Sequence, residues 1–231
     1  MQELDKKKWT KKNSVNSFFS SKHPPSYPSE MLVKILSSSR YSFLSNKFIK
    51  KKKKICEIGC FAGNNIRFFI ETNQDAHGVE INYELIDMCK KNLKRLGYKF
   101  NQISLGNNLQ IPHKSNFFDA LVSINTLHYS AKNEIPLVLN EFKRVLKTNG
   151  ILYLETVNVD DEFVKQSKRE SKFNWLHLGK GFRNKSILSF FDGSTHLKKE
   201  LEKYFRKVEI YKKNEITNQT KKSFLVAVCK V

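Results

Sequence analysis

From Lys54 onwards, short apolar runs alternate with amphipathic segments, and this alternation limits the chain to few folds. Five of the apolar runs predict strands, at residues 54–59, 76–81, 98–104, 117–129 (with its exit loop) and 151–157. Three of the segments between them predict helices, at residues 64–73, 83–97 and 134–150, the last two closed by Gly97 and Gly150. Strands that alternate with helices imply right-handed crossovers, so we expect a mainly parallel sheet with helices on both faces.

The two ends of the chain depart from this alternation. Residues 1–48 are expected to form an N-terminal arm on the substrate side, with a short helix that begins at Ser29. Residues 194–214 predict a helix leading into a strand, and residues 221–231 predict a final strand, antiparallel because the connection is short. We therefore expect one domain over residues 49–231, with an insertion at about 158–193 that has no clean period and lies over the active site.

The formal net charge of +20 raises the question of a nucleic-acid or anionic membrane partner, because a basic surface gathers polyanions whatever the fold. The excess is nearly all lysine, whereas arginine is the side chain expected where phosphates or guanine edges are bound by two hydrogen bonds. A solvated lysine surface is therefore the better interpretation. The hydrophobic content of 39% and the aromatic content of 12% are compatible with a folded core.

The cysteines, histidines and apolar runs indicate the compartment and the cofactor classes. The four cysteines form no C-x-x-C pair, which fits a reducing compartment, and no metal-ligand spacing occurs, so we predict no metal. No apolar stretch approaches the roughly 18 residues needed to span a bilayer, and no signal peptide is evident. We expect a soluble, cytoplasmic protein that is a monomer or a dimer.

The turn after the first predicted strand contains Gly59 and Gly63 and is followed by Asn64 and Asn65, which can cap a helix. In an open α/β sheet, ligands bind beyond the carboxyl ends of the strands, and a helix N-terminus there favours an anionic group. Two ligands suit such a turn, a dinucleotide and S-adenosylmethionine.

Charge and spacing separate these two ligands. A dinucleotide requires the spacing G-x-G-x-x-G and a pyrophosphate against the turn, whereas this turn has G-x-x-x-G. Glu57, two residues before Gly59, would repel a phosphate but suits the ammonium of a methionyl group, whose carboxylate would meet the helix N-terminus near Asn64. Glu80 ends the second predicted strand, where a carboxylate accepts hydrogen bonds from ribose hydroxyls; a solvated strand-end charge is the alternative.

Four segments carry a family resemblance: ICEIGCFAG at 55–63, GVEIN at 78–82, LGNNLQIPHKSNFFDALVSINTLHYS at 105–130 and EFKRVLKTNGILYLET at 141–156. In this order and at these distances they resemble the class I S-adenosylmethionine-dependent methyltransferases, most of all the small-molecule type. The resemblance covers residues 54–157, and the last two strands by pattern. It implies an α/β, Rossmann-like, doubly wound seven-stranded sheet, mostly parallel, with the last strand antiparallel and inserted beside the sixth.

The resemblance also implies S-adenosylmethionine as the cofactor and a set of residues around it. By motif position these are Glu57, Gly59, Cys60, Phe61, Ala62, Gly63, Glu80, Ile81, Asn107, Asn108, Leu109, Ser123 and Asn125. Family members usually have aspartate where Asn107 stands, and the Asn107 amide oxygen can still accept from the adenine amino group. Phe61 replaces a frequent family glycine, so we expect no positive φ there and a ring that points away from the cofactor or covers one side of it.

Methyl transfer is an in-line displacement on a sulfonium, so the protein must align the acceptor and, for an oxygen acceptor, remove its proton. His128, in the exit loop of the fourth strand, is the best-placed candidate base, and packing of that loop is the alternative role. The candidate substrate contacts are Tyr27, His128, Tyr129, Trp175 and His177. For those in the arm and the insertion, an ordinary packing role is the alternative.

The expected function is S-adenosylmethionine-dependent methylation of a small or carrier-linked polar acceptor. A sugar or nucleotide-sugar hydroxyl is suggested by the arm sequence SYPSE at 26–30, by analogy with sugar-modifying methyltransferases. The alternatives are an RNA methyltransferase, suggested by the charge, and a non-catalytic protein that binds the cofactor or a partner on the same fold. NTLHY at 125–129, in place of an N-P-P-Y type tetrapeptide, favours the small acceptor, and Glu57 with the glycine spacing disfavours a dinucleotide oxidoreductase.

Overall fold

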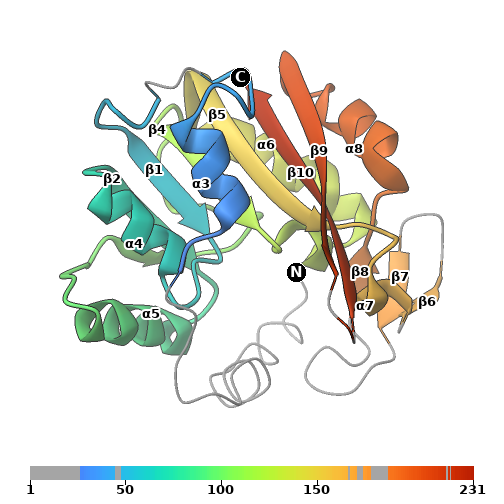
Figure 1. The fold of residues 1–231 in the computed structure, drawn as a ribbon, viewed down its shortest axis with the longest axis horizontal. Helices are drawn as coiled ribbons and strands as arrows, with labels where there is room; N and C mark the ends of the chain where they lie inside the picture. The colour runs from blue at the N-terminus through green and yellow to red at the C-terminus, as the bar shows by residue number, and fades with distance from the viewer. Residues whose placement is uncertain are drawn as a thin grey trace.

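The computed structural model describes residues 27–44, 48–165, 167–170, 174–177, 187–216, 218 and 220–231 (Figure 1). Within these residues, seven strands form one sheet in the order β3-β2-β1-β4-β5-β10-β9. Their bounds are β1 (Lys54–Ile58), β2 (Asp75–Glu80), β3 (Ile103–Leu105), β4 (Phe118–Ile124), β5 (Leu146–Val157), β9 (Lys207–Ile216) and β10 (Lys221–Lys230). β10 lies antiparallel between β5 and β9, and the remaining neighbours pair in parallel.

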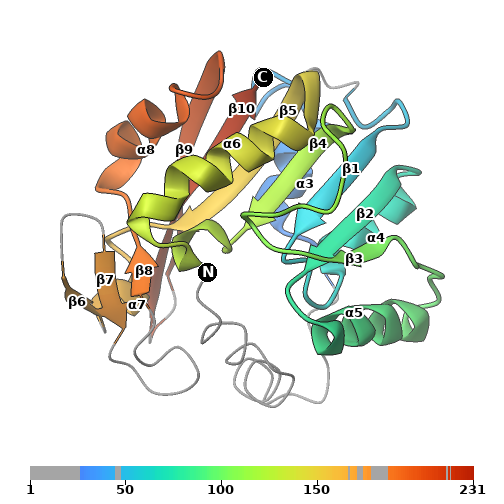
Figure 2. The ribbon, with the colours of Figure 1, turned by 180° about the vertical axis from the view of Figure 1, so that it is seen from behind.

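Helices cover both faces of the sheet, because successive side chains of a strand point to opposite sides. α3 (Glu30–Ser37), α4 (Asn64–Glu71) and α5 (Tyr83–Arg95) lie on one face (Figure 1), and α6 (Ile135–Val145) and α8 (Gly193–Leu201) on the other (Figure 2). In β1, Ile55 packs into the core under the first face and Cys56 into the core under the second. The predicted doubly wound sheet, with its last strand antiparallel beside the sixth, is confirmed. No described helix is both long and apolar enough to cross a membrane.

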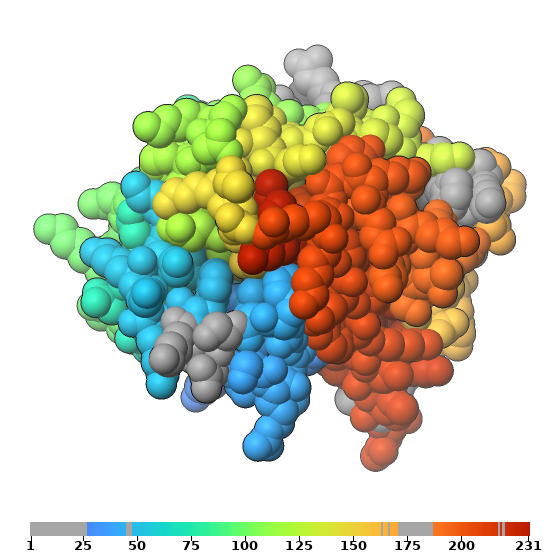
Figure 3. Space-filling model, turned by 90° about the horizontal axis from the view of Figure 1, so that it is seen from above, coloured from blue at the N-terminus to red at the C-terminus, as the bar shows by residue number. Residues whose placement is uncertain are grey.

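The N-terminal helix α3 is part of the packed domain. Ser29 is its N-cap, as predicted, and its hydroxyl accepts from the backbone N–H of Leu32 at 3.5 Å. Three side chains of α3 are buried in the core of its face of the sheet. The segment that follows α3 lies next to β9 (Figure 3), where the N–H of Phe43 donates to Glu209 Oε2 at 2.9 Å.

The end of α6 differs from the prediction. α6 ends at Val145 and β5 begins at Leu146, so Gly150 does not close the helix. A Cβ at Gly150 would lie 2.7 Å from the carbonyl oxygen of Lys147. Glycine is therefore needed at this position because the chain folds back closely on itself.

The start of β3 also differs, since the strand spans Ile103–Leu105 and not residues 98–104. The N–H of Tyr98 donates to the carbonyl of Leu93 at 2.9 Å, so Tyr98 belongs to the end of α5. Gly97, with a φ of 88°, closes α5 as predicted.

The segment predicted as an insertion contains a second sheet beside the carboxyl ends of the main strands. Its order is β6-β7-β8, all antiparallel, and a short helix, α7, precedes it. The bounds are α7 (Glu162–Lys165), β6 (Ser167–Arg169), β7 (Asn174–His177) and β8 (Ile187–Ser189). Leu188 and Phe190 pack with Phe224 of β10 and with Tyr129, which follows β4. This small sheet therefore shares a core with the carboxyl ends of the main strands.

The turn from β1 to α4 requires both of its glycines. Gly59 has a φ of 69°, and a Cβ there would lie 2.5 Å from Cγ2 of Thr126, just after β4. Gly63 has a φ of 78°, and a Cβ there would lie 2.9 Å from the sulfur of Cys89 on α5. A left-handed backbone and a close neighbouring side chain both favour glycine. Thr126 and Cys89 therefore restrict these two positions of the turn to glycine.

We expect Gly59→Ala to lower the free energy of unfolding by about 2–4 kcal/mol, from left-handed strain and from overlap with Thr126. Thr126→Ser removes the overlapping methyl and keeps the hydroxyl that lies 2.6 Å from Ser123 Oγ. In that background Gly59→Ala should cost only the strain, about 1–2 kcal/mol. Urea unfolding of the four proteins measures both costs, and equal costs in the two backgrounds would contradict the overlap.

Candidate functional site

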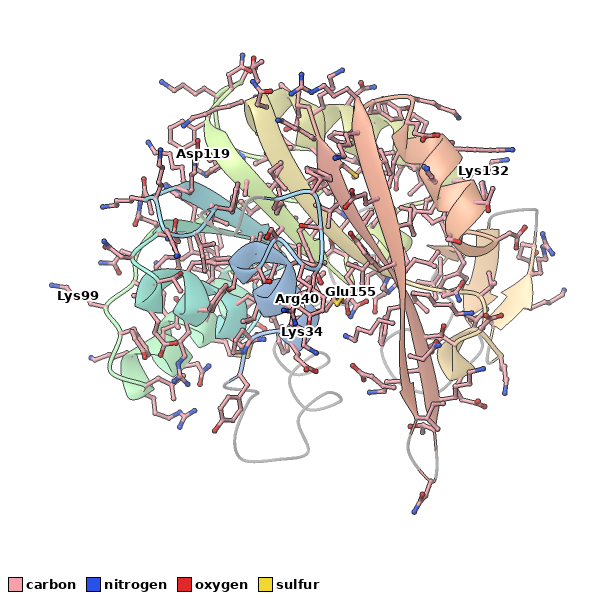
Figure 4. The ribbon with its side chains drawn as sticks, turned by 45° about the horizontal axis from the view of Figure 1, so that its top comes forward. Lys34, Arg40, Lys99, Asp119, Lys132 and Glu155 are labelled. Carbon is pink, nitrogen blue, oxygen red and sulfur yellow. The ribbon has the colours of Figure 1, made fainter. Side chains whose placement is uncertain are left out.

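Four neighbouring strands, β1, β2, β4 and β5, end at one edge of the sheet. They bring Glu57, Glu80, Asn125 and Glu155 to that edge, and Figure 4 labels Glu155 at the end of β5. Four buried oxygen atoms at this edge have no hydrogen-bond partner among the described residues: Glu57 Oε2, Asn125 Oδ1, Thr156 Oγ1 and Asn158 Oδ1. Buried polar atoms are normally paired, so this edge suits a ligand that offers hydrogen-bond donors.

Glu57 is the most strongly perturbed carboxyl group of the edge. It is 3% exposed, and its Oε1 accepts from Nδ2 of Asn65 at 2.6 Å. Burial raises the pKa of Glu57 to about 8; the hydrogen bond from Asn65 opposes the shift, and the nearby charge of Glu80 adds to it. A cation placed against Oε2 would favour the ionised form, because it would supply the missing partner.

Asn64 and Asn65 do not cap α4, contrary to the expectation from the sequence. The N-cap of α4 is Gly63, and it has no side-chain cap. Asn64 Nδ2 donates to the carbonyl of Tyr27 at 2.9 Å, and Asn65 Oδ1 accepts from the N–H of Ser29 at 2.8 Å. Both asparagines therefore hold the start of the N-terminal helix. The first N–H groups of α4 have no partner within the helix and leave its positive end open to an anion.

Glu80 is buried where β2 ends, with 4% of its surface exposed. Its Oε1 accepts from the N–H of Phe61 at 2.8 Å, and its Oε2 accepts from the N–H of Ile81 at 2.9 Å. Burial raises the pKa of Glu80, and these two hydrogen bonds oppose the shift. Each carboxylate oxygen can accept a second hydrogen bond, so Glu80 can bind a diol while it holds the turn.

The backbone of Phe61 contradicts the expectation of a negative φ, since its φ is 43°. This left-handed conformation accompanies the hydrogen bond from its N–H to Glu80. Such a conformation costs a non-glycine residue about 1–2 kcal/mol. The carboxylate of Glu80 thus holds the turn in a shape for which glycine is the usual residue.

The loop after β3 uses its asparagines within the protein. Asn107 Oδ1 accepts from the N–H of Leu109 at 2.8 Å and from that of Gln110 at 3.1 Å. Both lone pairs of this oxygen are engaged, which counts against the contact expected between this oxygen and an adenine amino group. Asn108 Nδ2 donates to the carbonyl of Thr126 at 3.2 Å and so joins this loop to the exit of β4.

The exit of β4 is shaped by tertiary hydrogen bonds. Asn125 is left-handed, with a φ of 55°, and its N–H donates to the carbonyl of Glu155 at 2.8 Å. His128 is 2% exposed, and its ring centroid lies 4.3 Å from that of Tyr129 and 6.2 Å from that of Phe190. These contacts favour the packing role for His128 over that of a base.

The remaining predicted residues divide into backbone positions, an exposed side chain and residues outside the described part. The side chains of Cys60 and Ala62 are buried in the core, so a contact with a ligand there would use their backbone atoms. Tyr27 is 80% exposed. Trp175 and His177 lie on β7, and their side chains are outside the described residues. In the described part of the chain, no three His, Cys, Asp or Glu side chains gather as a metal site.

Three residues that complete this edge were not predicted from the sequence. The hydroxyl of Tyr153 donates to Glu155 Oε2 at 3.1 Å, and Lys213 Nζ lies 3.0 Å from Glu155 Oε1. Glu155 is 2% exposed. On the sequence, Tyr153 and Glu155 are alternate residues of a strand, and nothing local indicates that Lys213 reaches across β10 to meet them.

Residues 49–218 match the family described as "Methyltransferase domain", which is most of the chain. An uncharacterized methyltransferase of Anoxybacillus flavithermus is 24% identical over 134 residues, 57% of this chain and 61% of the relative. The chain thus spans less than two thirds of that curated relative.

Solved structures share the fold. The PH0226 protein of Pyrococcus horikoshii is 15% identical with a TM-score of 0.63, covering 94% of this chain and 99% of its own. The 1,6-didemethyltoxoflavin-N1-methyltransferase of Burkholderia thailandensis is 11% identical with a TM-score of 0.56, covering 79% and 72%. The match to the domain family and the predicted motifs agree: the chain belongs to the class I S-adenosylmethionine-dependent methyltransferases.

Proposed function

We propose that this protein transfers the methyl group of S-adenosylmethionine to a small polar acceptor. The observation that carries the proposal is a buried carboxyl group that lies near the positive end of a helix at the end of β1. Among the described residues, Oε2 of Glu57 has no hydrogen-bond partner, and the positive end of α4 begins six residues later at Gly63. An amino acid zwitterion matches both groups, because its ammonium favours the ionised form of Glu57 and its carboxylate suits the helix N-terminus.

The second buried carboxylate supports the same ligand. Glu80 is held by two backbone N–H groups, and its further lone pairs suit the hydroxyls of a ribose. A dinucleotide would place a pyrophosphate near Glu57, where charge repulsion opposes it. When bound, S-adenosylmethionine supplies an electrophilic methyl group on a sulfonium. The chain's own contribution is to bind this ligand, exclude water and align the acceptor.

A small acceptor is supported by two features. The Burkholderia structure contains S-adenosylhomocysteine and 1,6-didemethyltoxoflavin, a small molecule. The exit of β4 has the sequence NTLHY, and its Asn125 has a buried amide oxygen with no partner among the described residues. We take a sugar or nucleotide-sugar hydroxyl as the first acceptor to test, with small amines and RNA as the competing classes.

Incubation with methyl-labelled S-adenosylmethionine and a panel of these acceptors tests the proposal. We expect label on a small acceptor, with turnover little affected by salt. If RNA is labelled instead, and its binding weakens steeply as salt rises, the acceptor is a nucleic acid and not a small molecule. If S-adenosylhomocysteine fails to bind in calorimetry, the proposal is wrong.

Glu80→Gln should weaken S-adenosylhomocysteine binding about 10- to 100-fold, because charge-assisted hydrogen bonds to the ribose are lost. Isothermal titration calorimetry measures the change. Glu84→Gln, at an exposed position in the first turn of α5, is the matched control and should bind as the wild type does. Unchanged affinity in Glu80→Gln would remove Glu80 from the binding site.

Binding of S-adenosylhomocysteine should strengthen as pH rises from 6 to 8. In the ligand-free protein the pKa of Glu57 is raised to about 8, so most Glu57 is protonated at pH 7, and an incoming ammonium favours the carboxylate. Binding at pH 7 should therefore release roughly one proton. Above pH 8 affinity should fall again as the ligand amine loses its own proton. Calorimetry in buffers of different ionisation enthalpy counts the protons, and Glu57→Gln should abolish the release.

His128→Gln should lower kcat less than about tenfold, since a packing role leaves the chemistry in place. Loss of a general base would cost about 100-fold or more and would remove one limb of the pH profile. Steady-state kinetics across pH on the acceptor found by labelling distinguishes the two roles. A large loss of kcat with unchanged thermal stability would restore His128 as the base.

A further inference from the structure

We propose that Asn65 is a positioning residue that couples ligand binding at Glu57 to the N-terminal helix α3. The inference rests on the proposed function, because it takes Glu57 as the partner of the cofactor's ammonium. A single buried side-chain amide holds both elements. Its Nδ2 donates to Glu57 Oε1 at 2.6 Å, and its Oδ1 accepts from the N–H of Ser29 at 2.8 Å.

The two hydrogen bonds of Asn65 depend on each other. Rotating the amide by half a turn would face its oxygen toward a carboxylate oxygen and its NH2 toward an N–H donor. Both contacts would then be repulsive, so only one orientation satisfies Glu57 and Ser29 together. Asn65 is 4% exposed, and water cannot easily replace either partner.

On the Glu57 side, Asn65 decides which oxygen is presented to a ligand. It occupies Oε1, and Oε2 remains without a partner among the described residues. The titratable groups that interact electrostatically with Glu57 are Glu80 of β2 and the thiols of Cys56 and Cys60. The pKa of the Cys56 thiol is raised by burial, and that of Cys60 by the neighbouring Cys89 thiol and by burial. None of these groups supplies positive charge, so Asn65 is the neighbour that favours the ionised carboxyl group.

On the α3 side, Asn65 accepts a hydrogen bond from Ser29, the first residue in a series of polar contacts that continues to Lys213. Ser29 is the N-cap of α3 and lies against Tyr153. Burial raises the pKa of Tyr153, the charge of Glu155 adds to the shift, and a hydrogen bond from Ser29 opposes it. Lys213 of β9 then pairs with Glu155 at 3.0 Å. The start of α3 is therefore fixed between α4, β5 and β9, with Asn65 as its link to Glu57.

This arrangement predicts a reciprocal effect. A ligand that pairs with Glu57 Oε2 tightens the Glu57 to Asn65 hydrogen bond, because that bond is stronger to a fully charged acceptor. A stronger hydrogen bond from Nδ2 to Glu57 restricts the whole amide group of Asn65. The hydrogen bond from the N–H of Ser29 to Oδ1 is then held more firmly as well. Since coupling between two sites acts equally in both directions, loss of Asn65 should weaken both ligand binding and the protection of α3 by the ligand.

Asn65→Leu, which keeps the size and removes both hydrogen bonds, tests the coupling. We expect the midpoint of the pH dependence of S-adenosylhomocysteine affinity to rise by about one unit, which at pH 7 is a loss of about tenfold. In hydrogen exchange, the ligand should slow the amides of α3 in the wild type and not in Asn65→Leu, while the amides of residues 59–63 stay protected in both.

Asn64→Leu is the matched control, because Asn64 bonds the neighbouring carbonyl of Tyr27 and not Glu57. It should keep the wild-type pH midpoint, because it leaves Glu57 and its hydrogen bond to Asn65 in place. Adding Asn65→Leu to Glu57→Gln should cost little further affinity, since both changes act through the same carboxylate.

The outcomes separate this inference from the proposed function. If the wild type fails to bind S-adenosylhomocysteine, the proposed function is wrong and the inference with it. If the wild type binds and Asn65→Leu shows the same pH midpoint and the same protection of α3, with only a lower melting temperature, Asn65 is merely structural and the inference alone is overturned. Should Asn65→Leu not fold, absence of ligand-induced protection of α3 in the wild type overturns it equally.

Discussion

Two carboxyl groups, Glu57 and Glu80, are buried at one edge of the sheet, and the elements around that edge are arranged to hold them. Charged groups in an apolar interior are costly unless they are hydrogen-bonded. Glu80 meets this requirement with two backbone N–H groups, one of which comes from the left-handed residue Phe61. Only one of the two carboxyl oxygens of Glu57 has a hydrogen-bond partner, Asn65. That bond offsets the effect of burial only in part, so the pKa of Glu57 is raised.

The incomplete pairing of Glu57 has consequences for stability as well as for binding. A carboxyl group whose pKa is raised on folding stabilises the protein most at low pH, and this contribution is lost as pH rises from its unfolded value toward the folded value of about 8. At neutral pH the ligand-free fold therefore bears a cost that a cation at Oε2 would remove. Strain and unpaired polar atoms of this kind commonly gather at functional sites, and among the described residues four such oxygen atoms lie at the ends of β1, β4 and β5.

Most of the fold could be predicted from the sequence, because alternating strand and helix periods admit few topologies. The predictions were wrong where the same local sequence pattern is compatible with two different structural roles of a residue. Gly150 and Gly97 both follow an amphipathic segment, yet Gly97 closes a helix and Gly150 permits a close return of the chain. Asn65 has the position of a helix cap, but its side chain turns away from α4 because Glu57 and Ser29 offer it better partners.

The sequence by itself determined the order of the elements of the main sheet, the family and the positions of Glu57, Glu80 and the glycine turn, because these depend on local period and short spacing. Only the tertiary structure decided how the edge is held together. Asn65 joins residues 29 and 57, and Lys213 reaches Glu155 across a strand that is inserted out of sequence order. Such contacts depend on which strands become neighbours and on which face each side chain points to, and these are properties of the assembled sheet that no local pattern contains.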